Sequence, residues 1–130
     1  LPGKTGGSRI MPLQNAELPD GMQWHYRLRA NGWTNALFDT QGATADNEGK
    51  AISPGAGLQV DKANRTINFI LPAKALGNPK SLSGLKLYLN TWDYDAGYRK
   101  LSPEGGNMAF AGGNPSDAKV LDESAVLMIP

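Results

Sequence analysis

Apolar and polar positions alternate cleanly in residues 22–30, MQWHYRLRA. Successive side chains of a strand point to opposite faces, so this period of two predicts a half-buried strand. The apolar face comprises Trp24, Tyr26, Leu28 and Ala30, and the polar face comprises Gln23, His25, Arg27 and Arg29. Asn31-Gly32 then gives a two-residue turn signal, and residues 33–39 read as the return strand. We therefore expect a β-hairpin over residues 22–39.

A second hairpin is predicted over residues 58–72. LQV (58–60) is a short strand, DKANR (61–65) a turn, and TINFILP (66–72) a strand that its proline ends. The next residues, PAKAL, predict one helical turn before Gly77. Further strands or extended pieces are expected at residues 9–13, 85–94, 108–110 and 125–129.

The remaining segments, residues 1–21, 40–57 and 97–119, are predicted to be largely loop. The chain has 16 Gly and 9 Pro residues, which is typical of short strands joined by turns. Together these elements predict an all-β domain, an antiparallel β-sandwich of about six to eight strands, immunoglobulin-like or DOMON-like in arrangement.

The segment LKLYLNTWDYDAGYR, residues 85–99, has two usable faces. One face carries Leu85, Leu87 and Leu89, and the other carries Tyr88, Trp92 and Tyr94. A row of leucines is sufficient to attach a strand to a core, so we expect the leucines to face inward. The aromatic row is then either covered by a second layer or a platform for a ligand.

Composition excludes several classes of function. The 130 residues suit one domain, the net charge is +1, and no polybasic stretch is present, which argues against nucleic acid or an anionic membrane as a partner. No apolar run is long enough to span a bilayer, so membrane insertion is not expected. With no Cys and one His, the usual zinc sites are not available, and His25 reads as a surface residue beside Arg27 and Arg29.

Asp93 and Asp95 permit three interpretations. Two carboxylates can flank a glycosidic bond, but a catalytic cleft normally takes its two acids from separate elements. An oxygen-rich DxDxG turn can hold Ca²⁺, although further acidic ligands are missing from this run. The third interpretation is that the two aspartates cap a turn. We expect no required cofactor, with a structural calcium ion as the one addition that these residues permit.

The aromatic residues give a stronger signal, because the flat C–H faces of sugars stack on Trp and Tyr rings. Polar side chains beside the rings suit the sugar hydroxyls, although aromatic residues on strands also serve packing. Trp24 and Tyr26 share a face with Leu28 and are expected in the core. The predicted carbohydrate-binding residues are Trp33, Tyr88, Trp92, Tyr94, Tyr98, Asn90 and Arg99.

The order of three motifs carries a family resemblance over nearly the whole chain. They are the opening GGSRIMPLQNAELPDGMQWHYRLRANGW, the segment TINFILPAKALG, and the block WDYDAGYRKLSPEGGNMAFAGG before a final VLDESAVLMIP. In this order they resemble the C-terminal domain of glucodextranase and its relatives. Those domains are DOMON-like β-sandwich modules of amylases, amylopullulanases and other α-glucan hydrolases.

The resemblance implies carbohydrate binding without catalysis. Residues 1–130 would form one secreted, monomeric, bacterial module, excised from the C-terminal region of a larger glycoside hydrolase. Its partners would be starch or another α-glucan and the catalytic domain of the parent enzyme. Two other functions stay open: a structural domain that packs on the catalytic domain or attaches the enzyme to the cell surface, and a small enzyme.

Overall fold

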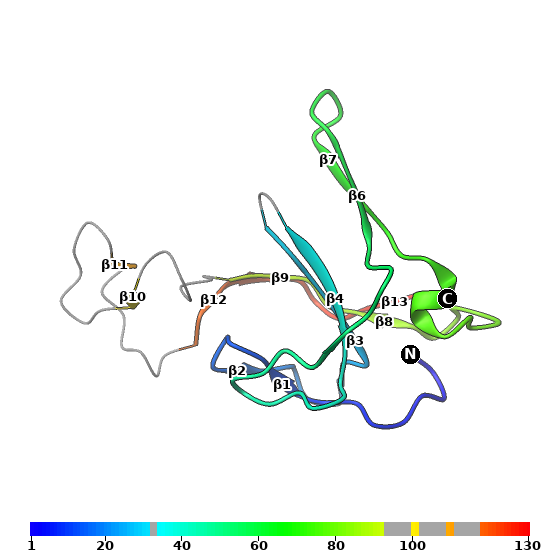
Figure 1. Ribbon diagram of the computed structural model, residues 1–130, viewed down its shortest axis with the longest axis horizontal. Helices are drawn as coiled ribbons and strands as arrows, with labels where there is room; N and C mark the ends of the chain where they lie inside the picture. Colours follow the sequence, from blue (N-terminus) through cyan, green and yellow to red (C-terminus); the bar gives the residue numbers. More distant parts are fainter. Residues whose placement is uncertain (32–33, 93–99, 102–108, 111–117) are drawn as a thin grey trace.

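A computed structural model describes residues 1–31, 34–92, 100–101, 109–110 and 118–130, and these residues form the all-β arrangement of Figure 1. The predicted all-β class is confirmed, and the pairing is antiparallel apart from β10 (Lys100–Leu101) with β11 (Ala109–Phe110). The strands are shorter and more numerous than the six to eight expected. They form several small sheets in place of a few long strands.

The central sheet contains three strands in the order β3 (Tyr26–Ala30), β4 (Asn35–Asp39) and β5 (Lys50–Ala51). The predicted first hairpin is confirmed; of its two predicted turn residues, Asn31 is described and Gly32 lies outside the described residues. The ladder ends at the pair Ala30 and Asn35, and beyond it the backbone N of Asn31 donates to the backbone O of Thr34 at 2.9 Å. The Asn31 side chain closes this loop, because its Oδ1 accepts from the backbone N of Thr34 at 2.8 Å and from its Oγ1 at 2.9 Å. β5 lies in the segment that we expected to be loop.

The N-terminal segment supplies much of the core. β1 (Ile10–Met11) pairs with β2 (Ala16–Glu17), which confirms the extended piece expected at residues 9–13. The start of the predicted strand 22–30 joins this segment through an isolated bridge between Ser8 and Trp24. The core cluster comprises the buried residues Met11, Leu18, Met22 and Trp24, with Ala16, Ala43, Tyr88 and Val120 packed against it.

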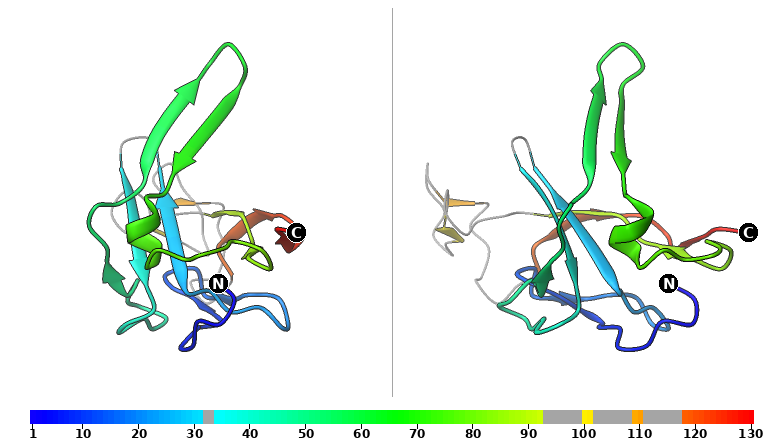
Figure 2. Two further views of the ribbon diagram at one scale, coloured as in Figure 1. Left: turned by 90° about the vertical axis from the view of Figure 1, so that its right-hand side faces the viewer. Right: turned by 45° about the vertical axis from the view of Figure 1, so that its right-hand side comes forward.

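The second hairpin is confirmed as β6 (Gly57–Asp61) with β7 (Thr66–Ile70), and it projects away from the rest of the chain (Figures 1 and 2). The expected helical turn follows as the 3-10 helix η1 (Ala73–Leu76). Gly77 ends this turn with a φ of 79°, a left-handed conformation that glycine adopts without steric cost.

A long two-stranded ribbon crosses the molecule below this hairpin (Figure 1). β8 (Lys86–Leu87) pairs with β13 (Leu127–Met128), and β9 (Asn90–Trp92) pairs with β12 (Val120–Glu123). The predicted strand 85–94 is thus divided into two short strands. A register shift between Val120 and Asp122 interrupts the pairing in the opposite strand.

The two faces of this ribbon are the reverse of our expectation. Leu87 and Leu89 are 46% and 68% exposed, whereas Tyr88 packs against the core cluster. The prediction that the leucine row attaches the strand to the core is therefore wrong for these residues. The core cluster has polar groups at its edge. The row with Tyr88 and Asn90 faces the cluster because its side chains can both pack and form hydrogen bonds.

Candidate functional site

Three of the predicted carbohydrate-binding residues lie in the described part of the chain. Tyr88, Asn90 and Trp92 follow one another at every second position, and all three are half-buried. The structure thus brings together one row of the predicted site, with Asn90 and Trp92 in β9 and Tyr88 just before it. The predicted site residues that lie outside the described residues are Trp33, Tyr94, Tyr98 and Arg99, together with the two proposed metal ligands Asp93 and Asp95.

Tyr88 is held at both ends of its side chain. Its ring packs against the core cluster, and its hydroxyl donates a hydrogen bond to the Glu123 carboxylate on the paired strand. Burial, together with this carboxylate, raises the pKa of Tyr88 to about 12. The phenol is therefore neutral at physiological pH and joins the two strands of the ribbon.

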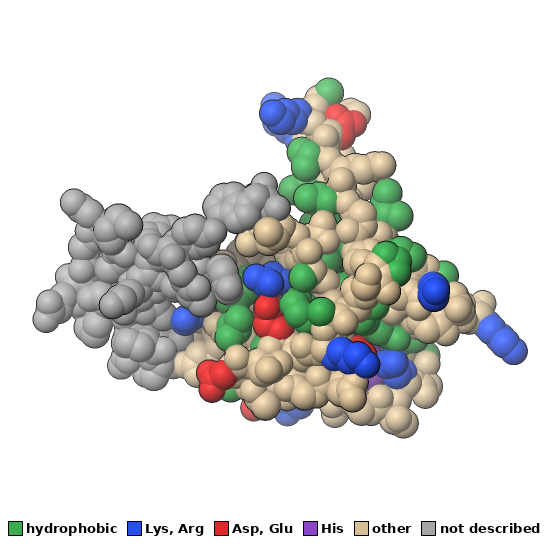
Figure 3. Space-filling view, in the orientation of Figure 1, with side chains coloured by type: hydrophobic (Ala, Val, Ile, Leu, Met, Phe, Trp, Pro, Cys, Tyr) green, Lys and Arg blue, Asp and Glu red, His purple; other side chains and the backbone are tan. Residues whose placement is uncertain are grey.

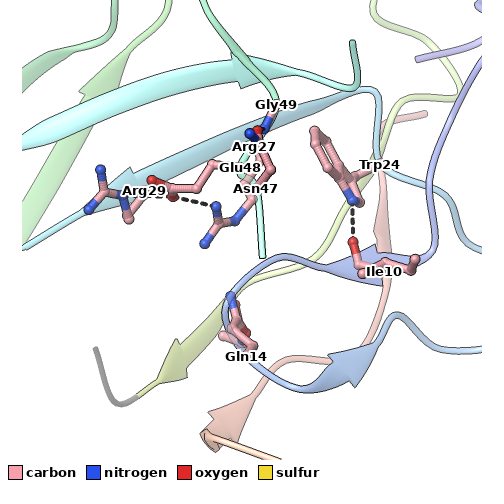
Figure 4. A network of polar contacts seen from close by, with 9 residues as sticks. Ile10, Gln14, Trp24, Arg27, Arg29, Asn47, Glu48 and Gly49 are labelled. Carbon is pink, nitrogen blue, oxygen red and sulfur yellow. Dashed lines mark hydrogen bonds and ion pairs between the residues drawn. The ribbon is translucent and has the colours of Figure 1, made fainter. Parts of the chain in front are cut away.

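Asn90 joins the ribbon to the N-terminal segment. Its Nδ2 donates to Oε1 of the buried Gln14. Gln14 lies in the turn between β1 and β2 (Figure 4). The backbone carbonyl of Gln14 also accepts from the backbone N of Lys119 at 2.9 Å. Buried amides need such partners, because an unpaired polar group loses its water without compensation. Any sugar that reached Tyr88 or Asn90 would contact side chains that already have a structural role.

Trp92 is the last residue of β9, and a cation lies over its ring. The guanidinium carbon of Arg27 is 5.5 Å from the centroid of the Trp92 ring. This separation is within the range of a cation–π interaction, which favours one orientation of the indole. Arg27 comes from β3, so the contact connects the end of the ribbon to the central sheet.

Arg27 is itself fixed by a carboxylate that it shares with Arg29. Oε2 of Glu48 is 2.6 Å from Nη1 of Arg27 and 2.9 Å from Nε of Arg29 (Figure 4). The side chains of Arg27, Glu48 and Arg29 are only 11%, 16% and 18% exposed. Burial lowers the pKa of Arg27, and the hydrogen bond and charge of Glu48 oppose that shift. The expectation that both arginines lie on the surface is therefore wrong.

A tight turn carries Glu48 to the two arginines. Gly49 has a φ of +96°, and a Cβ at this position would lie 2.1 Å from the backbone oxygen of Asp39. Oδ1 of Asn47 accepts from the backbone N of Gly49 at 2.9 Å and holds the turn. Sequence reasoning missed Glu48 because residues 40–57 were read as loop. The Asn-x-Gly spacing around it is a turn signal that could have drawn attention to this acid.

Catalytic and metal-binding groups are sparse in the described part of the chain. No group of three or more His, Cys, Asp or Glu residues that could hold a metal ion lies within it. His25 is half-buried, and burial lowers its pKa. Among the same described residues, no helix has the length and apolar character needed to cross a membrane.

The comparison with family models accounts for nearly the whole chain. It places the chain among binding modules, and the structure gives this module an all-β fold. More particularly, the matching model is described as the C-terminal binding module, SLH-like, of glucodextranase; it covers residues 3–127, and the chain belongs to this family. The resemblance inferred from the three motifs is therefore confirmed. Searches of curated proteins and of solved structures found no match.

Proposed function

We propose that this chain is a non-catalytic module that binds starch or a related α-glucan outside a bacterial cell. It would hold an attached glycoside hydrolase, such as an amylase, a pullulanase or a glucodextranase, on its polymeric substrate. The membership of a family of glucodextranase binding modules supports the binding role. The observation that carries the sugar-binding part is the fixed indole of Trp92 at the end of β9.

A stacking site works best when the ring is fixed before the ligand arrives, because less conformational entropy is lost on binding. Trp92 meets this requirement through two successive contacts. Glu48 pairs with Arg27, and the guanidinium of Arg27 lies over the indole. In this proposal Trp92 is the stacking residue, whereas Arg27 and Glu48 are positioning residues.

The other predicted ligands belong to the same proposal. Residues 93–99 continue directly from Trp92 in the sequence, so Tyr94, Tyr98 and Arg99 can extend the site beyond the strand end. Trp33 follows the strand that carries Arg27. Tyr88 and Asn90 would contribute from the inner part of the row, alongside their bonds to Glu123 and Gln14.

One short site of this kind gives weak binding to a single oligosaccharide. Useful adhesion comes from repeated contacts with an insoluble polymer and from the link to a catalytic domain, which raises the effective concentration of each second contact. The proposal therefore predicts much stronger retention on granular starch than affinity for a soluble maltooligosaccharide would indicate.

The first test is retention of the purified chain on granular starch, with cellulose as the control polymer and maltoheptaose as the competitor. Retention on starch that maltoheptaose displaces supports the proposal. A folded chain that passes through starch and cellulose alike contradicts it.

The residue assignment is tested by Trp92→Ala and Trp33→Ala, each measured for starch retention and thermal melting. We expect both variants to lose retention while they still melt cooperatively. Leu89→Ala is the matched control, because Leu89 lies on the exposed face of the same ribbon. Full retention in both tryptophan variants would reject these two residues as sugar ligands.

For Asp93 and Asp95 we propose a structural calcium site. Acidic oxygens in a short turn are the ligands that this hard cation prefers. Thermal melting with excess Ca²⁺ and with a chelator tests the site: a fall in melting temperature on chelation that Asp93→Asn abolishes supports calcium. An unchanged melting temperature would leave the two aspartates as turn caps.

A second candidate function is an interface domain that packs on the catalytic domain or attaches the enzyme to the cell surface. The exposed leucines of the ribbon favour it, because Leu87, Leu89 and Leu127 give an uncovered apolar row. A pure interface module would show no retention on starch and would self-associate when isolated. Retention that maltoheptaose reverses, in a monomeric chain, argues for the first function.

A further inference from the structure

The β6–β7 hairpin has one apolar and one polar face. Cross-strand partners share a face, and the register pairs Leu58 with Phe69 and Val60 with Ile67. The opposite face carries Gln59, Asp61, Thr66 and Asn68 toward the turn, and the pair Gly57 and Ile70 at the base, where Ile70 is 51% exposed. The alternation over residues 58–61 and 66–69 is typical of a sheet with one buried face. The apolar side chains are nevertheless 39% (Leu58), 60% (Val60), 59% (Ile67) and 38% (Phe69) exposed.

This uncovered face is poorly explained as ordinary surface. The hairpin projects from the body, and apolar side chains follow it along its length (Figure 3). An isolated two-stranded hairpin is marginally stable in water and gains stability by packing against another layer. A contiguous exposed apolar face of this kind marks an interaction site.

The charges around the hairpin specify what kind of surface can cover it. Lys62 and Arg65 lie in the turn, and Lys74 lies in η1, which follows β7 after Leu71 and Pro72. Among the described residues none of these three cations makes an ion pair. The one nearby acid, Asp61, accepts from the backbone N and Nδ2 of Asn64 and so holds the turn. A partner with acidic residues at its rim would complement both ends of the hairpin.

The same charges disfavour a second copy of the chain. In a two-fold symmetric pair each hairpin face would meet its own equivalent. In a parallel pair, Lys62 and Arg65 of one copy lie against the same two residues of the other copy. In an antiparallel pair, they lie near Lys74 of the other copy. Cations meet cations in both, and like-charge juxtaposition opposes association.

We propose that the Leu58, Val60, Ile67 and Phe69 face docks against the apolar face of a β-sheet with an acidic rim. The chain belongs to a family of C-terminal modules of an enzyme, glucodextranase, so we place that sheet in another domain of the same polypeptide. The flat surface of paired side chains from two strands suits sheet-on-sheet packing, in which two apolar faces interdigitate. The proposal is independent of the sugar site, because it uses no residue of the Trp92 row.

Site-specific photo-cross-linking in the full-length gene product tests this docking. A benzophenone amino acid is placed at Val60 or Ile67 on the apolar face, and at Gln59 or Asn68 on the polar face as matched controls. We expect the two apolar positions to give at least fivefold more cross-link than the controls. Peptide mass spectrometry is expected to place it in an apolar strand, flanked by Asp or Glu, of another domain in the same polypeptide.

Charge reversal supplies a second readout that does not disturb the apolar face. Lys62→Glu is expected to lower the cross-link yield from Ile67 at least threefold, whereas Lys50→Glu on β5, outside the hairpin, leaves it unchanged. Covalent dimers of the module, equal yields from both faces, or no peptide cross-link in a folded protein would each overturn the proposal. An unchanged yield in Lys62→Glu would overturn its acidic-rim part.

Discussion

The core cluster and the β6–β7 hairpin are built from the same types of residue but end in opposite environments. Met11, Leu18, Met22 and Trp24 come from short, irregular pieces and are buried. The hairpin has the more regular alternation, and its apolar face is exposed. Periodicity therefore identifies which side chains share a face, whereas burial depends on whether another segment reaches that face.

The core cluster and the β6–β7 hairpin also differ in where their polar contacts lie. A hydrogen bond joins the core cluster to β1: Nε1 of Trp24 donates to the backbone oxygen of Ile10 at 2.7 Å (Figure 4). The hairpin keeps its polar contacts within its own turn, where Asn64 donates to Asp61. We therefore expect substitutions in the cluster to change stability, and substitutions on the hairpin face to change association.

The largest expected effect is that of Trp24→Ala. It removes a buried ring and its hydrogen bond, so we expect a loss of about 3–5 kcal/mol in the free energy of unfolding. Val60→Ala on the hairpin is the matched comparison and should cost less than about 1 kcal/mol. Urea unfolding of both variants measures the two values. Equal losses would remove the distinction between the cluster and the hairpin.

A smaller loss in the free energy of unfolding is expected for Glu48→Gln. This change leaves the charges of Arg27 and Arg29 largely buried without their shared carboxylate, so unfolding should become easier by about 2–3 kcal/mol. The control is Glu17→Gln, because Glu17 is exposed and its ion pair with Arg9 is long: Oε2 of Glu17 lies 3.6 Å from Nη2 of Arg9. That change should cost less than about 1 kcal/mol. Similar losses in the two variants would contradict a structural role for the buried pair.

The smallest effect is a pH dependence that arises from Tyr88. The folded-state pKa is about 12, whereas an unfolded tyrosine titrates near about pH 10. The folded chain therefore keeps the Tyr88 proton to a higher pH than the unfolded chain does. The stabilisation from Tyr88 is complete below about pH 10 and is lost as the pH rises toward about 12. Urea unfolding between pH 8 and 11.5 should show that wild type and Tyr88→Phe converge in stability at high pH. A constant difference would exclude this linkage.

The elements most open to prediction were those with local signals. The alternation of residues 22–30 gave the first hairpin, although its pairing starts at Tyr26 because Trp24 bonds to Ser8 instead. The second hairpin followed from its turn composition and from the proline after TINFIL. The orientation of residues 85–92 could not be predicted, because each row carries large side chains that can pack: leucines in one, and Tyr88 and Trp92 in the other. The choice between them depends on the irregular N-terminal segment, where Gln14 lies.

The candidate site was predictable only in its aromatic part. The sequence indicated Trp92 as a ligand-binding residue, a prediction that awaits measurement, but gave no sign of what fixes its ring. Arg27 was read as a surface residue because the polar face of a strand usually meets solvent. Its partner Glu48 is 21 positions away in the sequence, in a segment without periodicity. Contacts between such distant residues follow from the fold and cannot be read from local patterns.

The most direct test of α-glucan binding at the end of β9 is calorimetric titration of maltoheptaose into wild type, Trp92→Ala and Leu89→Ala. The two variants change opposite faces of one ribbon, and thermal melting of each shows whether a loss of structure contributes to any difference between them. We predict that Trp92→Ala weakens the affinity at least tenfold and that Leu89→Ala stays within twofold of wild type. Equal affinities in all three folded proteins, or no binding by wild type, would contradict the account.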